Sequence, residues 1–336
     1  MKTALVVGKF YPPHAGHKYV IDTARKHADK VTVMVADRPE YRIPGKQRLQ
    51  WLKQIQPDAD YRLFKDKLDD EDSAGWGKST LDFLGFKPDA VVSSEDYGPP
   101  YAAQMGIKHI EADKPRQAVP CSATQIRRDP YEMWTYLSPP VKAFFALRVC
   151  IVGAESTGKT TLSKALAKHY NTEWVPEYGR LYTEQNIKDV FHHQWTDEEF
   201  VHIARTQNKI EDEAAGRCNK VLICDTDSFA TSIWYERYFH GRSAKIDSLA
   251  AGRSYDLYIV PDVKTPFVQD GWRDGDEQIR NWMHQRFLRK LEFWGKDYLL
   301  VSGTVDERLA QITPVIDRLL QTRHRLAGQA VTLQDV

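Results

Sequence analysis

The stretch Gly153-Ala154-Glu155-Ser156-Thr157-Gly158-Lys159-Thr160 decides the fold of the second half of the chain. It fits the pattern G-x-x-x-x-G-K-[ST] of a phosphate-binding loop. A predicted buried strand at 148–152 precedes it and a predicted helix at 159–170 follows it, which is the order of elements that such a loop needs. The stretch therefore predicts an α/β domain that binds a nucleotide at the end of a parallel sheet.

The residue types in this loop have physical reasons. Gly153 and Gly158 allow a tight turn whose N–H groups point inward, and the positive end of the following helix attracts phosphate. Lys159 is expected to reach the β and γ phosphates of ATP, and Thr160 to offer its hydroxyl to Mg²⁺. The predicted ATP contacts of this half are Gly153, Glu155, Ser156, Thr157, Gly158, Lys159, Thr160, Thr161 and Arg273.

Carboxylates near the loop bear on the reaction, because a phosphate loop alone does not separate kinases from GTPases or motor proteins. Asp225 ends a predicted strand at 221–224, where a carboxylate would face the metal, and Asp227 follows two residues later. Glu177 follows another predicted strand and is a rival for contact with the acceptor hydroxyl. Any of the three could instead be a surface acid. No Asn-Lys-x-Asp run that would bind guanine is present.

The segment Asp270-Gly271-Trp272-Arg273 lies where a mobile lid is expected in a kinase. Charge that builds on a transferred phosphoryl group needs cations that arrive after ATP binds. Arg273 is the predicted lid cation, with Arg180 in support near the substrate. The alternative is an exposed loop arginine with no role in the reaction.

Predicted strands alternate with helical patterns along both halves, which indicates an α/β chain with two doubly wound parallel sheets. The predicted strands are 4–7, 31–35, 61–64, 90–93 and 108–111 in the first half, and 148–152, 221–224, 257–260 and 298–301 in the second. Predicted helices include 197–215, 304–321 and one that begins at Glu277. The acidic segment 66–77 around Trp76 is interpreted as a solvated loop rather than a lid.

Ser138-Pro139-Pro140 marks the expected domain boundary, because two prolines do not fit inside a helix. We expect domains at 1–138 and 148–322, joined by a linker at 139–147 and followed by a tail at 323–336.

A second candidate site follows the first predicted strand, in the string GKFYPPHAGH at residues 8–17. Open parallel sheets bind ligands at the carboxyl ends of their strands. Pro12 and Pro13 stiffen the approach, Gly16 permits close packing, and His14 and His17 share a face where the next helix begins. Two imidazoles at a helix N-terminus can donate hydrogen bonds to phosphate oxygens, which favours a functional role over a structural one.

Ser122-Ala123-Thr124-Gln125 is typical of a capping box, with Ser122 at the helix N-terminus, Gln125 reaching back, and Arg127 in the first turns. Such a helix end could hold the outer phosphates of ATP, although a plain capped helix with a surface arginine would have the same sequence.

Composition excludes several classes of protein. The chain has 336 residues with 47 Lys and Arg against 46 Asp and Glu, a net charge of +1, so no global positive field exists to bind DNA. No apolar run is long enough for a signal peptide or a membrane span. The four cysteines show no metal or disulfide spacing, so a reducing cytoplasm is expected. Assembly into a homo-oligomer stays open.

The string GKFYPPHAGH resembles the G-x-F-x-P-x-H-x-G-H signature of the nucleotidylyltransferase superfamily, and Ser122-Ala-Thr-Gln-Ile-Arg127 is similar to its second signature. Together with Ser93-Ser-Glu-Asp-Tyr-Gly98, the phosphate loop, Glu177-Tyr-Gly-Arg180 and Asp225-Thr-Asp227, the chain resembles the NadR family of bifunctional nicotinamide-mononucleotide adenylyltransferases and ribosylnicotinamide kinases. The resemblance implies a Rossmann-like nucleotidylyltransferase domain followed by a P-loop kinase domain.

The resemblance also implies a reaction sequence and roles for individual residues. Nicotinamide riboside and ATP would give nicotinamide mononucleotide (NMN), and NMN with a second ATP would give NAD and pyrophosphate. The implied catalytic residues are His14, His17, Lys9, Arg127, Lys159, Asp225 and Glu177, with Mg²⁺ on Thr160 and Asp225. The implied ATP contacts of the first half are Gly8, Phe10, Gly16, Ser122 and Thr124. Arg180, Asp227 and Trp174 would bind substrate, with Trp195 and Trp234 as further candidates to stack on nicotinamide.

One departure from the family concerns regulation. NadR proteins of enteric bacteria carry an N-terminal helix-turn-helix, whereas here Met1 leads directly into the first predicted strand. The repressor role is therefore not expected. Two alternatives to the salvage enzyme stay open: a nucleotide-sensing module with vestigial chemistry, and a related fusion enzyme with another acceptor.

Overall fold

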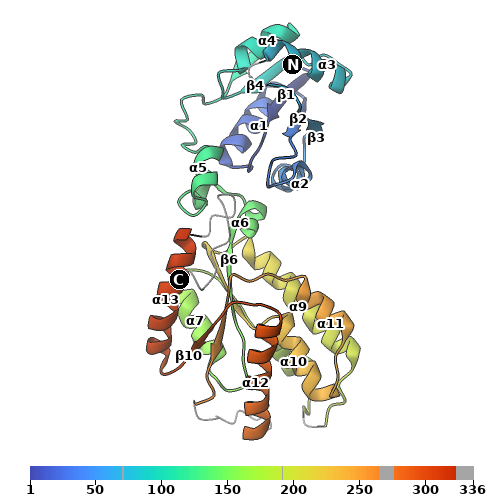
Figure 1. Cartoon of the computed structure of the whole chain (residues 1–336). Helices are drawn as coiled ribbons and strands as arrows, with labels where there is room; N and C mark the ends of the chain where they lie inside the picture. The colour runs from blue at the N-terminus through green and yellow to red at the C-terminus, as the bar shows by residue number, and fades with distance from the viewer. Residues whose placement is uncertain (70–71, 191, 265–275, 323–336) are drawn as a thin grey trace. The chain divides into compact units, whose positions relative to one another are not determined.

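The computed structural model describes residues 1–69, 72–190, 192–264 and 276–322 (Figure 1). It divides the chain into two compact units, of which the first comprises Met1–Val141 and the second begins at Lys142. Each unit is built on one five-stranded sheet, and all strand pairs within the two sheets are parallel. This confirms the predicted fold class. None of the described helices combines the length and the apolar character needed to span a bilayer.

The sheet of the first unit has the strand order β3-β2-β1-β4-β5. Its strands are β1 (Thr3–Gly8), β2 (Lys30–Asp37), β3 (Asp60–Lys65), β4 (Ala90–Ser93) and β5 (Lys108–Glu111). Its helices are α1 (Ala15–His27), α2 (Gly45–Ile55), α3 (Ser73–Leu84), α4 (Gly98–Met105) and α5 (Ala123–Arg128), followed by the short helix η1 (Trp134–Tyr136). The strand order reverses between β1 and β4, and ligands of open parallel sheets bind at such a reversal.

Helices cover both faces of this sheet because neighbouring strand residues point to opposite faces. Ala4 and Val6 of β1 pack with α1 and α2 in one core cluster. Leu5, between them in sequence, packs with α3 and α4 in another. The loop after β1 therefore emerges from a strand that is fixed on both sides.

The sheet of the second unit has the strand order β10-β9-β6-β8-β7. Its strands are β6 (Leu147–Ile151), β7 (Trp174–Val175), β8 (Val221–Asp225), β9 (Leu257–Pro261) and β10 (Tyr298–Val301). Its helices are α7 (Lys159–His169), α8 (Tyr178–Asn186), α9 (Asp197–Ala215), α10 (Ser228–Phe239), α11 (Ala244–Ala251), α12 (Glu277–Phe293) and α13 (Val305–Thr322). In Figure 1, α7 and α13 lie on one side of this sheet and α9 to α11 on the other.

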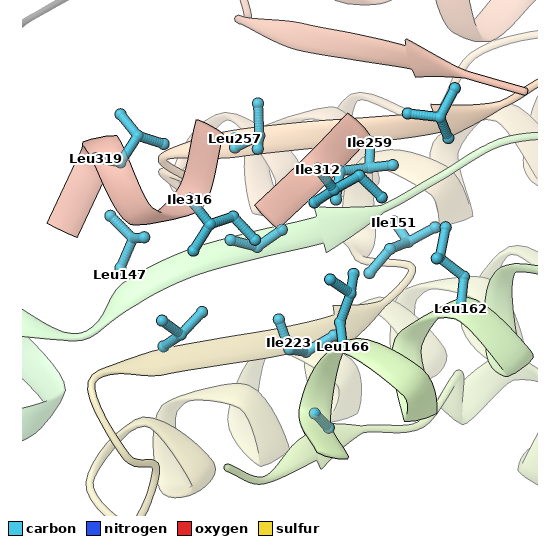
Figure 2. Packing of buried hydrophobic residues seen from close by; sticks show 14 residues of the cluster. Leu147, Ile151, Leu162, Leu166, Ile223, Leu257, Ile259, Ile312, Ile316 and Leu319 are labelled. Carbon is cyan, nitrogen blue, oxygen red and sulfur yellow. The ribbon is translucent and has the colours of Figure 1, made fainter. Parts of the chain in front are cut away.

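The core beneath α7 and α13 is made of branched aliphatic side chains, as Figure 2 shows. Leu162 and Leu166 of α7 and Ile312 and Ile316 of α13 are fully buried against the sheet. Burying each such side chain contributes about 1.5–3 kcal/mol relative to leaving it exposed. The phosphate loop, which joins β6 to α7, is thus attached at both ends to this buried core.

The predicted strands all occur, and most begin or end within a residue or two of their predicted limits. Two other expectations need correction. The segment predicted as a solvated loop at 66–77 is partly helical, because α3 begins at Ser73 and Asp72 caps it by accepting a hydrogen bond from the Gly75 N–H. Pro139 and Pro140 occupy the first turn of helix α6 (Pro139–Phe145), where a missing N–H costs no intrahelical hydrogen bond. The expected linker is therefore largely helical.

Candidate active sites

The phosphate loop of the second unit has the conformation that its glycines predict. Gly153 and Gly158 have φ angles of 143° and 82°, in the region that side chains disfavour. Two buried arginines hold the outer side of the loop: Arg280 donates to the carbonyls of Glu155 and Ser156, each at 3.2 Å, and Arg308 donates to Thr157 O at 2.7 Å. With these carbonyls engaged, the loop is fixed for its N–H groups to bind an anion.

Asp225 and Thr160 meet at the carboxyl end of β8. The Thr160 hydroxyl donates to Asp225 Oδ2 at 2.6 Å, while Asp225 Oδ1 is buried without a hydrogen-bond partner among the described residues. Burial, and next the negative charge of Glu177, raise the pKa of Asp225 to about 6. Lys159 donates to Ala154 O at 2.8 Å, so its ammonium lies against the loop. The predicted group of Lys159, Thr160 and Asp225 is therefore present.

A cavity of about 290 Å³, here called the aromatic cavity, lies beside this group. Glu155, Glu177 and Arg180 contribute its charged wall. Its apolar wall is formed by Trp195, Phe200, Trp234 and Tyr238. The combination of aromatic faces with a few charged groups is typical of a pocket for a polar ring compound.

Two of the predicted substrate contacts do not line the aromatic cavity. The Asp227 carboxylate is fully buried as the N-cap of α10, where it accepts from Ala230 N and from the Tyr258 hydroxyl, each at 2.8 Å. Burial, and next the charge of Glu211, raise its pKa to about 7. Trp174 packs against the core cluster below α7 and lies under the Lys164 ammonium at 5.1 Å. Asp227 caps a helix and Trp174 packs on the core, so Trp195 and Trp234 are the better candidates for stacking.

The remaining predicted residues of this unit are distributed as follows. Arg180 lines the aromatic cavity and donates to Glu184 at 2.8 Å. Thr161 is exposed on α7. Arg273, the predicted lid cation, lies outside the described residues. Glu155, predicted as an ATP contact, lines the aromatic cavity, and its Oε2 lies 3.6 Å from Arg237.

In the first unit, His14 and His17 lie together at the start of α1, with ring centroids 3.7 Å apart. His14 is the N-cap, and its Nδ1 accepts from the Gly16 N–H at 3.1 Å. Burial, and next the charge of Arg116, lower the pKa of His14 to about 3, and burial likewise holds the pKa of His17 well below 6.5. Both imidazoles are therefore neutral. Since His14 Nδ1 accepts a hydrogen bond, its ring proton is on Nε2, which can donate to an anion.

A cavity of about 420 Å³, here called the histidine cavity, opens at the carboxyl ends of β1 and β4. The predicted residues that line it are Gly8, Lys9, Phe10, His17, Thr124 and Arg127. A hollow of about 210 Å³ shares His17 and Thr124 with it and contains the other predicted residues, His14, Gly16 and Ser122. All nine predicted residues of this half therefore line one or both of two adjoining cavities.

Arg127 links the two signatures of the first unit. Its guanidinium donates to Tyr11 O at 2.8 Å and to Thr124 Oγ1 at 2.9 Å. Ser122 caps α5 as predicted by accepting from the Gln125 N–H at 3.2 Å. The Gln125 side chain accepts from the Ser122 hydroxyl instead of binding its backbone N–H, which differs from the predicted capping box.

Several contributors were absent from the sequence prediction. Arg48 of α2 is fully buried and donates to Lys9 O, to Ala36 O at 3.0 Å and to Ile43 O at 3.0 Å, and it pairs with Asp37. Arg116 lines the hollow next to His14, and Trp76 lines the histidine cavity. A single sequence carries no local signal for an arginine that acts 39 residues away from the loop it supports.

Comparisons with known proteins agree with this geometry. Residues 5–129 match the model of the cytidylyltransferase-like family, and residues 148–308 match that of an AAA domain. Two solved structures resemble the chain over 98% of its length and 97% of theirs: a NadR protein in complex with NR, with TM-score 0.75 and 22% identity, and a NadR protein in complex with NAD and AMP-PNP, with TM-score 0.72 and 20% identity. At these identities the likeness shows the fold.

Two curated relatives are more similar in sequence. The trifunctional NAD biosynthesis/regulator protein NadR of Escherichia coli (strain K12) is 31% identical over 294 residues, which cover 80% of this chain and 71% of the relative. The protein of the same name from Salmonella typhimurium (strain LT2) is 30% identical over 307 residues, which cover 84% and 74%. With this identity over more than two thirds of each relative, the chain belongs to the NadR family.

Proposed function

We propose that this protein is an NAD salvage enzyme with two successive ATP-dependent reactions, one in each unit. The second unit phosphorylates nicotinamide riboside to NMN, and the first unit joins NMN to the adenylyl group of another ATP to give NAD and pyrophosphate. The observation that carries the proposal is the pairing, in one chain of this family, of a phosphate loop beside an aromatic cavity with a histidine cavity at a reversal of strand order.

In the kinase reaction, the 5′-hydroxyl oxygen of the riboside forms a bond to the γ-phosphorus of ATP, and ADP leaves. The hydroxyl proton passes to Asp225 or to Glu177, and Lys159 moves from Ala154 O to the phosphates. Thr160 and Asp225 would hold Mg²⁺, which neutralises phosphate charge when it is bound.

A metal at that position fits the residues present. The Asp225 oxygen that has no partner and the neighbouring Thr160 hydroxyl are both oxygen ligands of the kind Mg²⁺ prefers. The described residues contain no cluster of three or more His, Cys, Asp or Glu side chains placed to bind a metal. The ion is therefore expected to be held mainly by phosphate oxygens, and its binding to depend on ATP.

In the adenylyl transfer, a phosphate oxygen of NMN forms a bond to the α-phosphorus of ATP, and pyrophosphate leaves. A phosphate dianion is already a nucleophile, so no general base is needed. The neutral imidazoles of His14 and His17 donate hydrogen bonds, and Lys9 and Arg127 supply positive charge, as negative charge develops on the leaving group. Ser122 and Thr124, at the N-terminal end of α5, contribute hydroxyl groups to the proposed phosphate site.

We assign the adenylyl transfer to a domain at 1–138 and the kinase reaction to a domain at 148–322. The four cysteines are buried, and their spacing in the sequence, which is typical of neither a metal site nor a disulfide scaffold, supports the inference of a reducing, cytoplasmic location.

The test is to incubate the pure protein with ATP, Mg²⁺ and nicotinamide riboside and to follow NMN, NAD, ADP and pyrophosphate by chromatography. NMN should appear first with one ADP for each molecule, and NAD should follow with one pyrophosphate. Formation of neither product would contradict the proposal, and formation of NMN without NAD would contradict its second half.

A further inference from the structure

Glu155 is a buried acid that neither proposed reaction uses. The residue is only 1% exposed, and neither carboxylate oxygen has a hydrogen-bond partner among the described residues. Arg237 neutralises part of its charge, but the shortest distance between the two side chains is 3.6 Å, longer than a hydrogen bond. A buried carboxylate without donors is costly, so the site is complete only when a ligand supplies donors.

Glu155 borders the aromatic cavity, which is the proposed site of the acceptor. A negative charge on the inner side of the phosphate loop would repel the triphosphate. The Glu155 backbone carbonyl is held on the outer side by Arg280 at 3.2 Å. The Glu155 side chain, which the sequence predicted to contact ATP, is therefore expected to contact the acceptor.

The position of Glu155 along the aromatic cavity matches the middle of a nucleoside. On one side it belongs to the same loop as Lys159, where the 5′-hydroxyl must react. On the other side its partner Arg237 lies 5.1 Å from the ring centroid of Trp234 and 5.3 Å from that of Tyr238, at the aromatic wall where the base would stack. In a nucleoside the ribose connects these two ends.

We propose that Glu155 is a specificity-determining residue whose two carboxylate oxygens accept hydrogen bonds from the 2′- and 3′-hydroxyls of the acceptor's ribose. Two vicinal hydroxyls supply two hydrogen-bond donors on neighbouring carbon atoms. Each of the two carboxylate oxygens of Glu155 could accept one of them. Arg237, 3.6 Å away, holds the carboxylate in place. This inference rests on the proposed kinase reaction and adds to it a preference for ribosides over deoxyribosides.

The test compares the full-length wild-type protein with Glu155→Gln, using nicotinamide riboside and its 2′-deoxy and 3′-deoxy analogues as acceptors. The wild type should lose about 10- to 100-fold in kcat/KM for each missing hydroxyl, because a hydrogen bond to a charged group is lost. Glu155→Gln should lose a similar factor with the riboside itself, mainly in KM, and should then discriminate little between the three acceptors. Its KM for ATP should be unchanged.

Glu213→Gln is the matched control, because Glu213 is exposed on α9 and its contact with Lys209 is 3.9 Å long. It should behave as the wild type with every acceptor. Glu155→Gln that keeps the wild-type preference for the riboside would overturn the proposal, as would a KM for ATP that rises as much as the KM for the riboside.

The wild-type enzyme alone also tests the proposal, so a variant that misfolds does not end the experiment. Equal kcat/KM for the riboside and both deoxy analogues would overturn the role of Glu155 while leaving the kinase reaction intact. If none of the three acceptors is phosphorylated, the result would instead contradict the proposed function on which the role of Glu155 rests.

Discussion

Asp225 is an acid that lowers the stability of the fold in which it acts. It is 1% exposed, and burial together with the charge of Glu177 raises its pKa from 3.8 to about 6. That difference corresponds to about 3 kcal/mol between the ionised and the protonated forms in the folded state. The folded protein therefore loses up to about 3 kcal/mol when it must keep this side chain ionised.

The sign of the pH dependence follows from the raised pKa. Below pH 3.8 Asp225 is protonated in both the folded and the unfolded protein, and its contribution to stability is fully present. As the pH rises through the folded-state pKa of about 6, the unfolded chain releases the proton more readily and that stability is lost. Above this range the penalty stays constant.

Asp225→Asn cannot ionise and should therefore raise the free energy of unfolding at pH 8. The amide oxygen can still accept a hydrogen bond from the Thr160 hydroxyl. We subtract about 1 kcal/mol from the gain in stability for the less favourable geometry of that hydrogen bond. We expect a gain of about 2 kcal/mol at pH 8, no gain at pH 4, and loss of riboside phosphorylation. Such an opposition between stability and activity is expected of a residue that is retained for its chemistry.

The assay is urea unfolding at pH 8 and at pH 4, with peptide-resolved hydrogen exchange to follow β6 and β8 of the second unit. Asp297→Asn is the control, because Asp297 is exposed and its substitution should change stability by less than about 0.5 kcal/mol. An Asp225→Asn protein that is no more stable than the wild type at pH 8 would refute the reasoning.

Three further outcomes follow from the contacts described above. Trp234→Leu should raise the KM for nicotinamide riboside about tenfold by removing a stacking face, whereas Trp174→Leu should lower stability without changing that KM; equal effects on KM would contradict the assignment. Arg48→Met should destabilise the first unit by about 3–5 kcal/mol in urea unfolding, because Asp37 and three carbonyls lose their donor; a loss below about 1 kcal/mol would show that Arg48 is dispensable. NMR of the imidazole nitrogens should find His14 neutral at pH 5, where an imidazole of ordinary pKa is charged; a protonated ring would contradict the neutral-donor mechanism.

The fold was predictable from sequence because its strongest signals are local. Short apolar runs such as Ala90–Ser93, which is buried along its whole length, are typical of strands in the interior of a parallel sheet. The phosphate loop and its flanking elements are contiguous in the chain, so the local sequence pattern is enough to predict them. The start of helix α3 was missed because residues 66–77 have a polar, glycine-containing composition typical of a loop. Asp72 caps the helix through its side chain, and an aspartate in such a segment is equally typical of a turn.

The sites were predictable to the extent that their residues follow strand ends. His14 and Lys159 lie at the ends of the loops that follow β1 and β6, and Asp225 is the last residue of β8, so topology alone brings them to a ligand. The direction in which a side chain points could not be predicted in this way. Asp225 and Asp227 are two residues apart, yet the turn at Thr226, with φ of 67°, leaves Asp225 in contact with Thr160 and makes Asp227 a helix cap. A sequence pattern does not specify such a turn.

The central claim is that two separate sites in one chain carry out the two reactions, and a complementation experiment tests it most directly. His17→Ala should still convert nicotinamide riboside to NMN without forming NAD. Lys159→Ala should form NAD from NMN but leave the riboside unchanged. Mixing the two variants with riboside, ATP and Mg²⁺ should restore NAD formation through released NMN. Loss of both half-reactions in either variant, with the protein still folded, would contradict the account.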